Sequence, residues 1–164
     1  MIFLKKFLIL PLLFCIICGC SQKRQVKPIL NNIAFTALVD YNSDKYNVDA
    51  TITDGALNLS VNEPEKINGF VLQIDKNDVK AEYKGISYDS DINSLPQAAI
   101  ARLLFNIVDD ISDKNLVCSN ENCEIIGEVD DIQYNFIFSP AGLPLSLNIE
   151  DINLKIEFSN VTLK

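Results

Sequence analysis

The stretch Ile152-Asn153-Leu154-Lys155-Ile156-Glu157-Phe158-Ser159 alternates apolar and polar residues without interruption. Successive side chains of a β-strand point to opposite faces of its sheet. This stretch therefore predicts a strand with one dry face, formed by every second residue, and one face in water. A sheet that is wet on one side is typical of antiparallel proteins, in which the core lies on the other side.

Short runs of the same kind, divided by Asn, Asp, Gly and Pro, fill most of the chain after Pro28. Such runs favour antiparallel strands joined by tight turns. Asp54-Gly55 predicts one of these turns and Lys76-Asn77 a second. We expect strands at residues 35–41, 48–52, 57–61, 69–75, 78–84, 124–129, 132–138, 143–149 and 152–158.

One segment between the two groups of strands has the period of a helix. Ser94 and Gln97 stand at capping-box spacing, and Pro96 lies in the first turn, where a proline costs no hydrogen bond. An apolar stripe at helical spacing then predicts a helix at residues 95–112. Phe105 lies about 120° from the centre of that stripe, so it is either a partly exposed packing residue or one that faces a ligand.

These elements predict a mainly β protein with one inserted helix, an α+β fold. An open sheet of roughly nine to eleven twisted strands curls. We therefore expect a curved antiparallel sheet that forms an incomplete β-barrel, with the helix against its concave face. One helix covers only part of that dry face, and the rest would be covered by a second short helix at residues 27–32, by a bound lipid or by a partner protein.

The N-terminus has the features of a secretory signal. Two lysines precede an apolar run at residues 7–17 that is too short for a comfortable transmembrane helix. Residues 17–20 read Ile-Cys-Gly-Cys, which resembles the bacterial lipobox, although Cys18 stands where the lipobox usually has Ser, Ala, Thr or Val. The resemblance implies cleavage before Cys20, thioether lipidation of its thiol and acylation of the new amino group, for instance with palmitate. An ordinary signal cleaved at Gly19, or an uncleaved anchor, is the alternative.

The chain thus divides into a signal peptide (residues 1–19), a lipidated basic tether (residues 20–29) and one domain (residues 30–164). The tether carries three positive charges, which favour contact with anionic headgroups. The domain has nine Lys and Arg residues against 22 Asp and Glu residues, a formal charge of −13. That charge argues against nucleic acid as a partner. We expect the protein to lie, lipid-anchored, on the extracytoplasmic face of the cell membrane.

Cys118 and Cys123 are the cysteines of the predicted domain. In an exported protein this pair predicts a disulfide that closes the polar turn between them. A metal site would need a second cysteine pair or histidines. A redox-active pair is disfavoured by the spacing and by the acidic surroundings.

The chain contains no histidine, which excludes mechanisms with a His base, a His-activated nucleophile or a His-ligated metal. It has no nucleophile elbow and no Gly-rich phosphate loop. Asp109-Asp110 and Asp130-Asp131 are pairs of adjacent residues, so their side chains point apart. Residues 89–94 begin like a calcium loop, but the Gly and the Glu that such a loop needs are missing from it. We expect no enzyme, cofactor or metal site, and an enzyme that uses carboxylates alone is the least favoured alternative.

Several segments resemble a known superfamily: the opening strands at residues 35–37 and 46–48, the step at residues 64–70, the mid-chain helix, and Gly142-Leu143-Pro144 before the last strands. Their order is similar to that of the LolA/LolB superfamily, whose wider circle includes mycobacterial lipid-binding lipoproteins of the LppX type. The similarity covers roughly residues 30–164 and rests on pattern rather than on a specific motif. It implies an incomplete β-barrel whose mouth is closed by helices, around an apolar cavity that receives acyl chains.

We therefore expect a membrane-anchored lipoprotein that binds a lipid or acyl chain in the concave face. The candidate ligand-binding residues are apolar positions of the strands and the helix: Phe70, Leu72, Ile74, Leu104, Phe105, Tyr134, Phe136 and Phe138. The alternative is a non-enzymatic interaction module that docks on a cell-envelope enzyme and stabilises it. The acidic domain favours this alternative, as does the occurrence of LolA-like lipoproteins in spore-forming bacteria.

Overall fold

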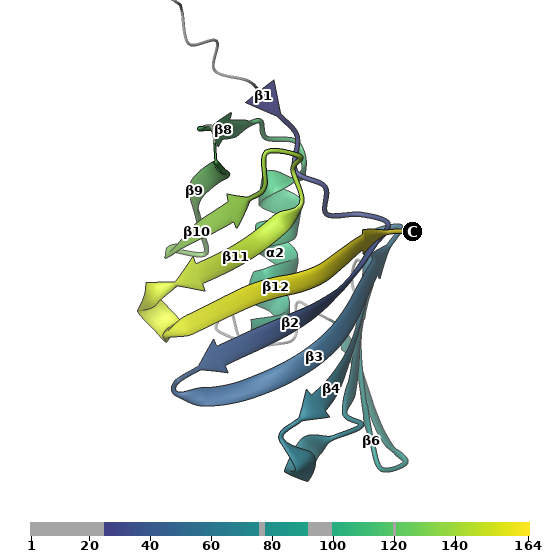
Figure 1. The fold of residues 1–164 in the computed structure, drawn as a ribbon. Coiled ribbons are helices and arrows are strands. Elements are labelled where there is room, and N and C mark those ends of the chain that lie inside the picture. Colours follow the sequence, from purple (N-terminus) through teal and green to yellow (C-terminus); the bar gives the residue numbers. More distant parts are fainter. Residues whose placement is uncertain (1–24, 76–77, 92–99, 120) are drawn as a thin grey trace, which may run out of the picture.

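A computed structural model describes residues 25–75, 78–91, 100–119 and 121–164 (Figure 1). Twelve strands form a single antiparallel sheet in the order β1-β8-β9-β10-β11-β12-β2-β3-β4-β5-β6-β7. The sheet is curved and not closed, and the helix α2 (Ile100–Ser112) lies against its concave face (Figure 1). The mainly β, α+β fold with a curved antiparallel sheet is thereby confirmed.

The elements other than α2 have the following bounds. Two single 3₁₀ turns interrupt the strands, η1 (Glu65–Ile67) and η3 (Glu150–Ile152). The strands are β1 (Gln25–Val26), β2 (Ile33–Tyr41), β3 (Asp44–Thr53), β4 (Ala56–Glu63), β5 (Val71–Asp75), β6 (Asp78–Tyr83), β7 (Ile86–Asp91), β8 (Leu116–Cys118), β9 (Cys123–Val129), β10 (Ile132–Phe138), β11 (Pro144–Ile149) and β12 (Leu154–Leu163).

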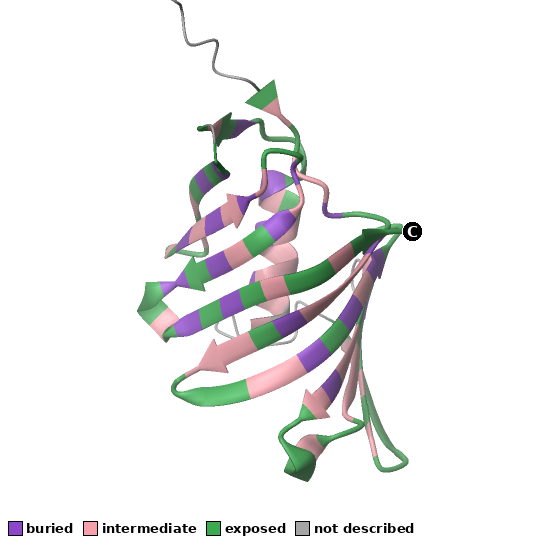
Figure 2. Cartoon of the chain, viewed as in Figure 1, coloured by how far each residue is buried: buried purple, intermediate pink, exposed green. Residues whose placement is uncertain are grey.

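The last strand confirms the predicted alternation of burial. Leu154 and Ile156 of β12 are buried, whereas Lys155 and Glu157, which alternate with them, are exposed (Figure 2). Ile152 is not part of the strand, because it is the last residue of the turn η3. Asn153, which follows it in the left-handed conformation, ends this turn before β12 begins. β12 then pairs with β11 on one side and with β2 on the other, so it joins the two halves of the chain into one sheet.

The hydrophobic core lies on the concave side of the sheet, where α2 packs. Leu103, Ile107 and Ile111 of α2 are fully buried there, together with aromatic side chains of β10. This agrees with the expected helix over its described part, while residues 95–99 lie outside the described residues. No helix among the described residues is long and apolar enough to cross a membrane.

A second short helix at residues 27–32, one of the three covers of the dry face that the sequence left open, does not form. This segment is irregular and runs past the turn between β10 and β11. The amide of Ile29 donates a hydrogen bond to the carbonyl of Gly142 at 2.7 Å, so the backbone is bonded to a distant turn rather than to its own helical neighbour. Gly142 also lies so close to the Lys27 carbonyl that a side chain there would collide with it.

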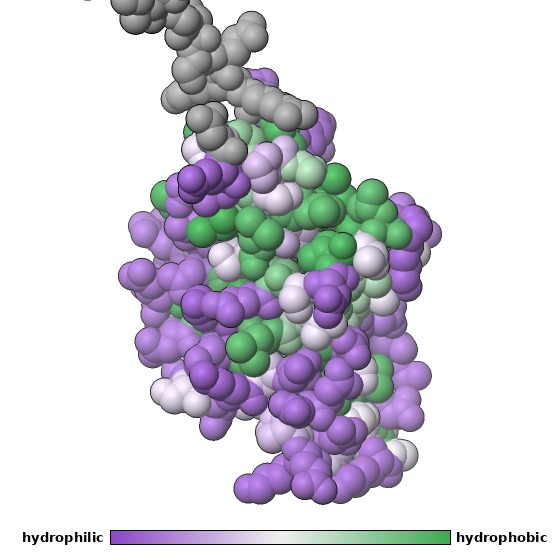
Figure 3. Space-filling model, viewed as in Figure 1, coloured by the Kyte–Doolittle hydropathy of each residue, from purple (hydrophilic) through white to green (hydrophobic). Residues whose placement is uncertain are grey.

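The outer face of the sheet is largely hydrophilic (Figure 3). Hydrophobic surface gathers in its upper part, over β11 and the C-terminal end of β12 (Figure 3). Leu145 and Leu163, which are 42% and 66% exposed, belong to these two strands. The dry face that the sequence predicts is therefore the concave one, next to α2.

Candidate functional site: an apolar cavity between sheet and helix

A cavity of about 210 Å³ lies between the concave face of the sheet and α2. Among its lining residues, Tyr46 alone carries a polar side-chain group. The wall is formed by Leu30, Ile33, Phe35, Ala37, Val39, Tyr46, Val48, Ile52, Leu57, Leu59, Val61, Leu72, Ile74, Ile100, Leu104, Ile107, Val108, Phe136, Pro144, Leu147, Ile156 and Phe158.

Small side chains in the middle of the sheet leave this space open. Ala37, Val48 and Val61 are cross-strand neighbours on β2, β3 and β4, and all three line the cavity. The first two turns of α2 contribute Ile100 and Leu104 on the opposite side. Ile107 and Val108 of α2 line the cavity as well. The helix also contacts β9, and its residue Asp110 is bonded to Tyr134 of β10.

Three phenylalanines form a continuous aromatic wall on one side of the cavity. The ring of Phe136 lies 5.6 Å from that of Phe158, and the ring of Phe158 lies 5.2 Å from that of Phe35, measured between centroids. Phe136 also stacks on Phe138 at 4.4 Å. Aromatic pairs at these separations stabilise each other beyond the area they bury, so this wall is held in place without a ligand.

The eight candidate ligand-binding residues do not all meet at the cavity. Four of them line it: Leu72, Ile74, Leu104 and Phe136. Phe138 is fully buried and pairs with Cys123 across β9 and β10. The other three, Phe70, Phe105 and Tyr134, lie in separate surroundings that are described below.

Phe105 packs away from the cavity. It lies against Ile74, Val79 and their neighbours in a small second cluster between α2 and strands β4 to β6. Of the two roles open to it from the sequence, the structure therefore favours packing.

Phe70 lines a hollow of about 220 Å³ at the edge of the sheet. We call it the edge hollow, and it is formed by Phe70, Ala81, Tyr83, Ile86 and Tyr88.

Tyr134 holds the helix to the sheet. Its ring covers Gly127, where any side chain would collide with it, and its hydroxyl donates a 2.5 Å hydrogen bond to Asp110 of α2. Asp110 also receives a hydrogen bond from Lys114 at 2.6 Å. Burial disfavours ionisation of Asp110, but these two hydrogen bonds outweigh it and lower the pKa of that carboxyl. Burial, followed by the hydrogen bond to Asp110, raises the pKa of Tyr134.

Several lining residues were missed as candidates from the sequence. Phe35 and Phe158 occupy inward positions of alternating strands, so their side of the sheet was predictable, but the alternation gives no distance between them. Ala37 carried no signal, because a small residue marks a cavity only when its neighbours on other strands are known.

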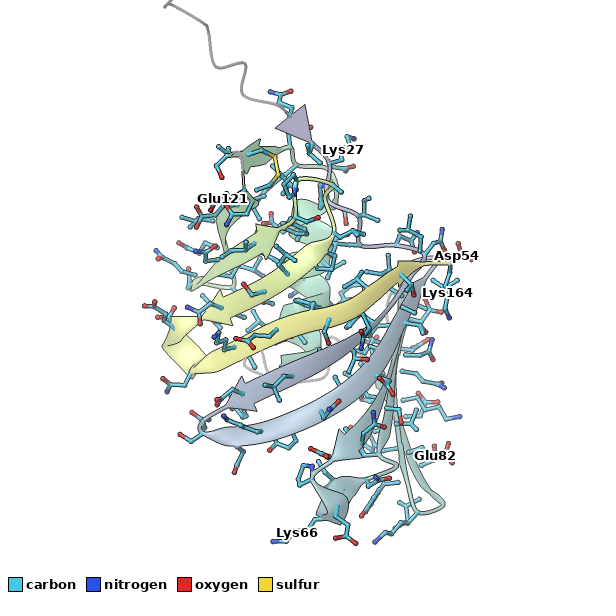
Figure 4. All side chains as sticks on the ribbon, in the orientation of Figure 1. Lys27, Asp54, Lys66, Glu82, Glu121 and Lys164 are labelled. Atoms are coloured by element: carbon cyan, nitrogen blue, oxygen red, sulfur yellow. A yellow bond between two sulfur atoms is a disulfide. The ribbon has the colours of Figure 1, made fainter. Side chains whose placement is uncertain are left out.

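The two cysteines of the domain are joined by a disulfide, as predicted. Cys118 and Cys123 are cross-strand partners on β8 and β9, with their Cα atoms 3.9 Å apart. Ser119 closes the turn between them, because its amide donates to the Asn122 carbonyl at 2.8 Å. The disulfide lies at the end of the sheet near Lys27 and Glu121 (Figure 4). Cys20, the predicted lipidation site, lies outside the described residues.

The paired carboxylates do not reach the cavity. Asp110 is bonded to Tyr134 and Lys114, and Asp130 accepts a 3.0 Å hydrogen bond from Asn106. In the described ranges of the chain, no three potential metal-ligating side chains of Asp, Glu, Cys or His come together.

Comparison with models of known protein families gives no match, and no match was found among curated proteins either. The likeness to the LolA/LolB superfamily therefore rests on the order of the elements and on the residues that carry them.

Proposed function

We propose that this protein is a lipid-anchored extracytoplasmic lipoprotein that binds the apolar chain of a lipid or fatty acid between α2 and the concave sheet. The observation that supports this most directly is the cavity of about 210 Å³ with a wall that is apolar apart from Tyr46. A water molecule in such a space would lack the polar partners that hold buried waters. An apolar chain would lose no hydrogen bond on entering it.

The volume sets the size of the ligand. Cavities of about 150 Å³ lined by Leu, Ile and Phe stay dry and bind a molecule such as benzene, whereas sites for whole small molecules measure about 300–1,000 Å³. The cavity therefore suits one chain, or part of one, and not both chains of a diacyl lipid. The wall contains no carboxylate, amine or thiol, so binding rather than catalysis is the activity that it supports.

The anchoring half of the proposal rests on the lipobox-like residues 17–20 and on the basic tether. Two or three acyl chains at about 0.8 kcal/mol for each buried CH₂ hold a protein stably on a membrane. The resemblance to the LolA/LolB superfamily supports the cavity. For the anchor the parallel is with LolB and the LppX-like proteins, which carry a lipid anchor, and not with LolA, which is soluble.

A pair of matched substitutions tests the cavity. Ala37→Leu places extra carbon atoms inside it, and Ala34→Leu makes the same change on the same strand but on the outer face. The full-length lipoprotein is released from membranes in mild detergent and examined by native mass spectrometry for bound lipid. We expect a lipid adduct on the wild type and on Ala34→Leu, and at least fivefold less of it on Ala37→Leu. A clean unliganded mass for all three proteins would contradict the proposal.

The interaction module remains the second candidate, favoured by the charge of the domain and by exposed hydrophobic side chains on the outer face of the sheet, such as Ile126 and Leu145. Crosslinking in membranes separates the two candidates. The interaction module would be favoured if the Ala37→Leu protein captures the same envelope enzyme as the wild-type protein and stabilises it equally well.

A further inference from the structure

The edge hollow is an apolar surface that α2 does not cover. It lies on the concave face of β6 and β7, because Ala81 and Tyr83 alternate with residues of the outer face and share their side of β6 with the buried Val79. Ile86 and Tyr88 of the edge strand β7 are 75% and 56% exposed. Edge strands are usually protected by charge or by cover, so exposed large side chains here call for an occupant.

A row of inward side chains connects the cavity with this hollow. Leu59 pairs with Leu72, Leu72 with Ala81, and Ala81 with Tyr88, across strands β4 to β7. Leu59 and Leu72 line the cavity, whereas Ala81 and Tyr88 line the edge hollow. Cross-strand partners lie on one face, and neighbouring strands are about 4.8 Å apart, so the row runs without interruption for about 14 Å.

Ala81 and Tyr88, at the end of this row, belong to neither hydrophobic core cluster of the described residues, whereas α2 packs on the next row of the same strands. Phe105 packs against the cluster of Ile74 and Val79, which are cross-strand partners one step along the same strands. Among the described residues, an apolar chain that leaves the cavity beside α2 therefore meets Ala81 and Tyr88 rather than the helix.

A lysine stands where such a chain would end. Lys84 and Gly85 form a tight turn with positive φ angles of 50° and 81° between β6 and β7, and the Lys84 ammonium lies 4.9 Å from the ring centroid of Tyr83. Tyr83 itself is held by a hydrogen bond from its hydroxyl to the Lys66 carbonyl.

Lys84 keeps its charge available for a ligand. Ion pairs join Lys114 to Asp110 and Lys155 to Glu157, and Lys84 is in neither of these. Glu82, the nearest carboxylate along β6, belongs to the outer face and projects from the sheet at this end (Figure 4). The domain as a whole carries a charge of −13, so an anionic group is retained here only through a local cation.

We infer that the ligand is a single-chain amphiphile with an anionic headgroup, whose chain follows the row from Leu72 to Ala81 and whose headgroup lies beside the Lys84 ammonium. This inference rests on the proposed function and adds a ligand class to it. A carboxylate or phosphate would form an ion pair with the Lys84 ammonium, reinforced by charge-assisted hydrogen bonds, while a neutral headgroup on a chain of the same length would form no ion pair.

The test compares two photoreactive probes of equal chain length, a dodecanoate and a dodecanol. Each is added to membranes that contain the full-length protein, and labelled peptides are quantified by mass spectrometry. The variants are Lys84→Gln, which removes the charge beside the Tyr83 ring, and Lys80→Gln, which removes the same charge from the outer face of β6. We expect Lys84→Gln to reduce labelling by the dodecanoate about three- to tenfold and to leave labelling by the dodecanol unchanged. Lys80→Gln should alter neither.

Two results would overturn the inference, and they differ. Saturable labelling of the cavity by both probes, with no change in Lys84→Gln, would leave the cavity as a lipid site but remove the headgroup role of Lys84. Labelling by neither probe would contradict the proposed function together with the inference. Lys84→Glu provides a check against misfolding, since it should reduce dodecanoate labelling further while dodecanol labelling persists.

Discussion

At the scale of single residues, the contact between Gly127 and Tyr134 decides how α2 is attached. The two residues are cross-strand partners on β9 and β10, and the missing side chain of Gly127 lets the tyrosine ring lie over the strand. The hydroxyl then reaches Asp110 in the last turns of the helix. The alternation of residues 132–138 predicted that Tyr134 faces inward. It could not predict the partner, which is 24 positions away in the sequence.

The hydrogen bond between Tyr134 and Asp110 predicts a pH-dependent stability. Because the pKa of Asp110 is lowered on folding, its contribution is present above the ordinary carboxyl pKa of about 4 and is lost as the pH falls through the folded-state pKa. Tyr134→Phe removes one of the two bonds that lower this pKa. We expect it to cost about 1 kcal/mol at pH 7 and less at pH 2–3, as measured by urea unfolding.

The control for this measurement is Ile126→Ala, a change of a 70% exposed side chain on β9. It should shift the free energy of unfolding by less than about 0.5 kcal/mol at every pH. An equal loss of stability for Tyr134→Phe at pH 7 and at pH 2 would show that the hydrogen bond to an ionised Asp110 is not the cause.

At the scale of elements, the long alternating strands and α2 were predictable, and the short or exposed ones were not. Each of the nine expected strands is present, β10 with the predicted ends and the other eight with one or both ends shifted. β1 and β8 are two and three residues long, too short for a period to be recognised. β7 was missed because five of its six residues are exposed, so burial imposes little pattern on it. The candidate helix at residues 27–32 does not form, because the hydrogen bond from Ile29 to the distant turn at Gly142 overrides the local preference of this segment.

The disulfide between β8 and β9 is expected to stabilise the end of the sheet where the tether leaves. Closing a loop with a sequence separation of 5 contributes about 2 kcal/mol in the chain-entropy model. The double substitution of Cys118 and Cys123 by Ser should therefore lower the free energy of unfolding by about 2 kcal/mol, measured in urea against the oxidised wild type. Addition of a reductant to the wild type should give the same loss, and a difference between the two would point to a packing effect of the serines.

At the scale of the whole molecule, the charge of −13 acts on the domain as a unit. The ion pairs Lys114–Asp110 and Lys155–Glu157 add one charge of each sign and so leave this net charge unchanged. Raising NaCl from about 0.01 M to about 0.1 M shortens the screening length from about 30 Å to about 10 Å. The compact state should gain about 1 kcal/mol from this screening, which calorimetry would detect as a higher Tm. A Tm that does not change would mean that the acidic residues are spaced too widely to repel one another.

The sequence by itself determined the antiparallel sheet, the helix over its described part, the cysteine pair and the exclusion of histidine-dependent chemistry. These properties follow from composition and from periods between neighbours along the chain. The tertiary structure decided which four of the eight candidate residues line the cavity, how large the cavity is, and that a row of side chains runs from it to the edge hollow. The physical reason is that a cavity depends on strand register and side-chain volume across the sheet, which bring together residues that are far apart in the sequence.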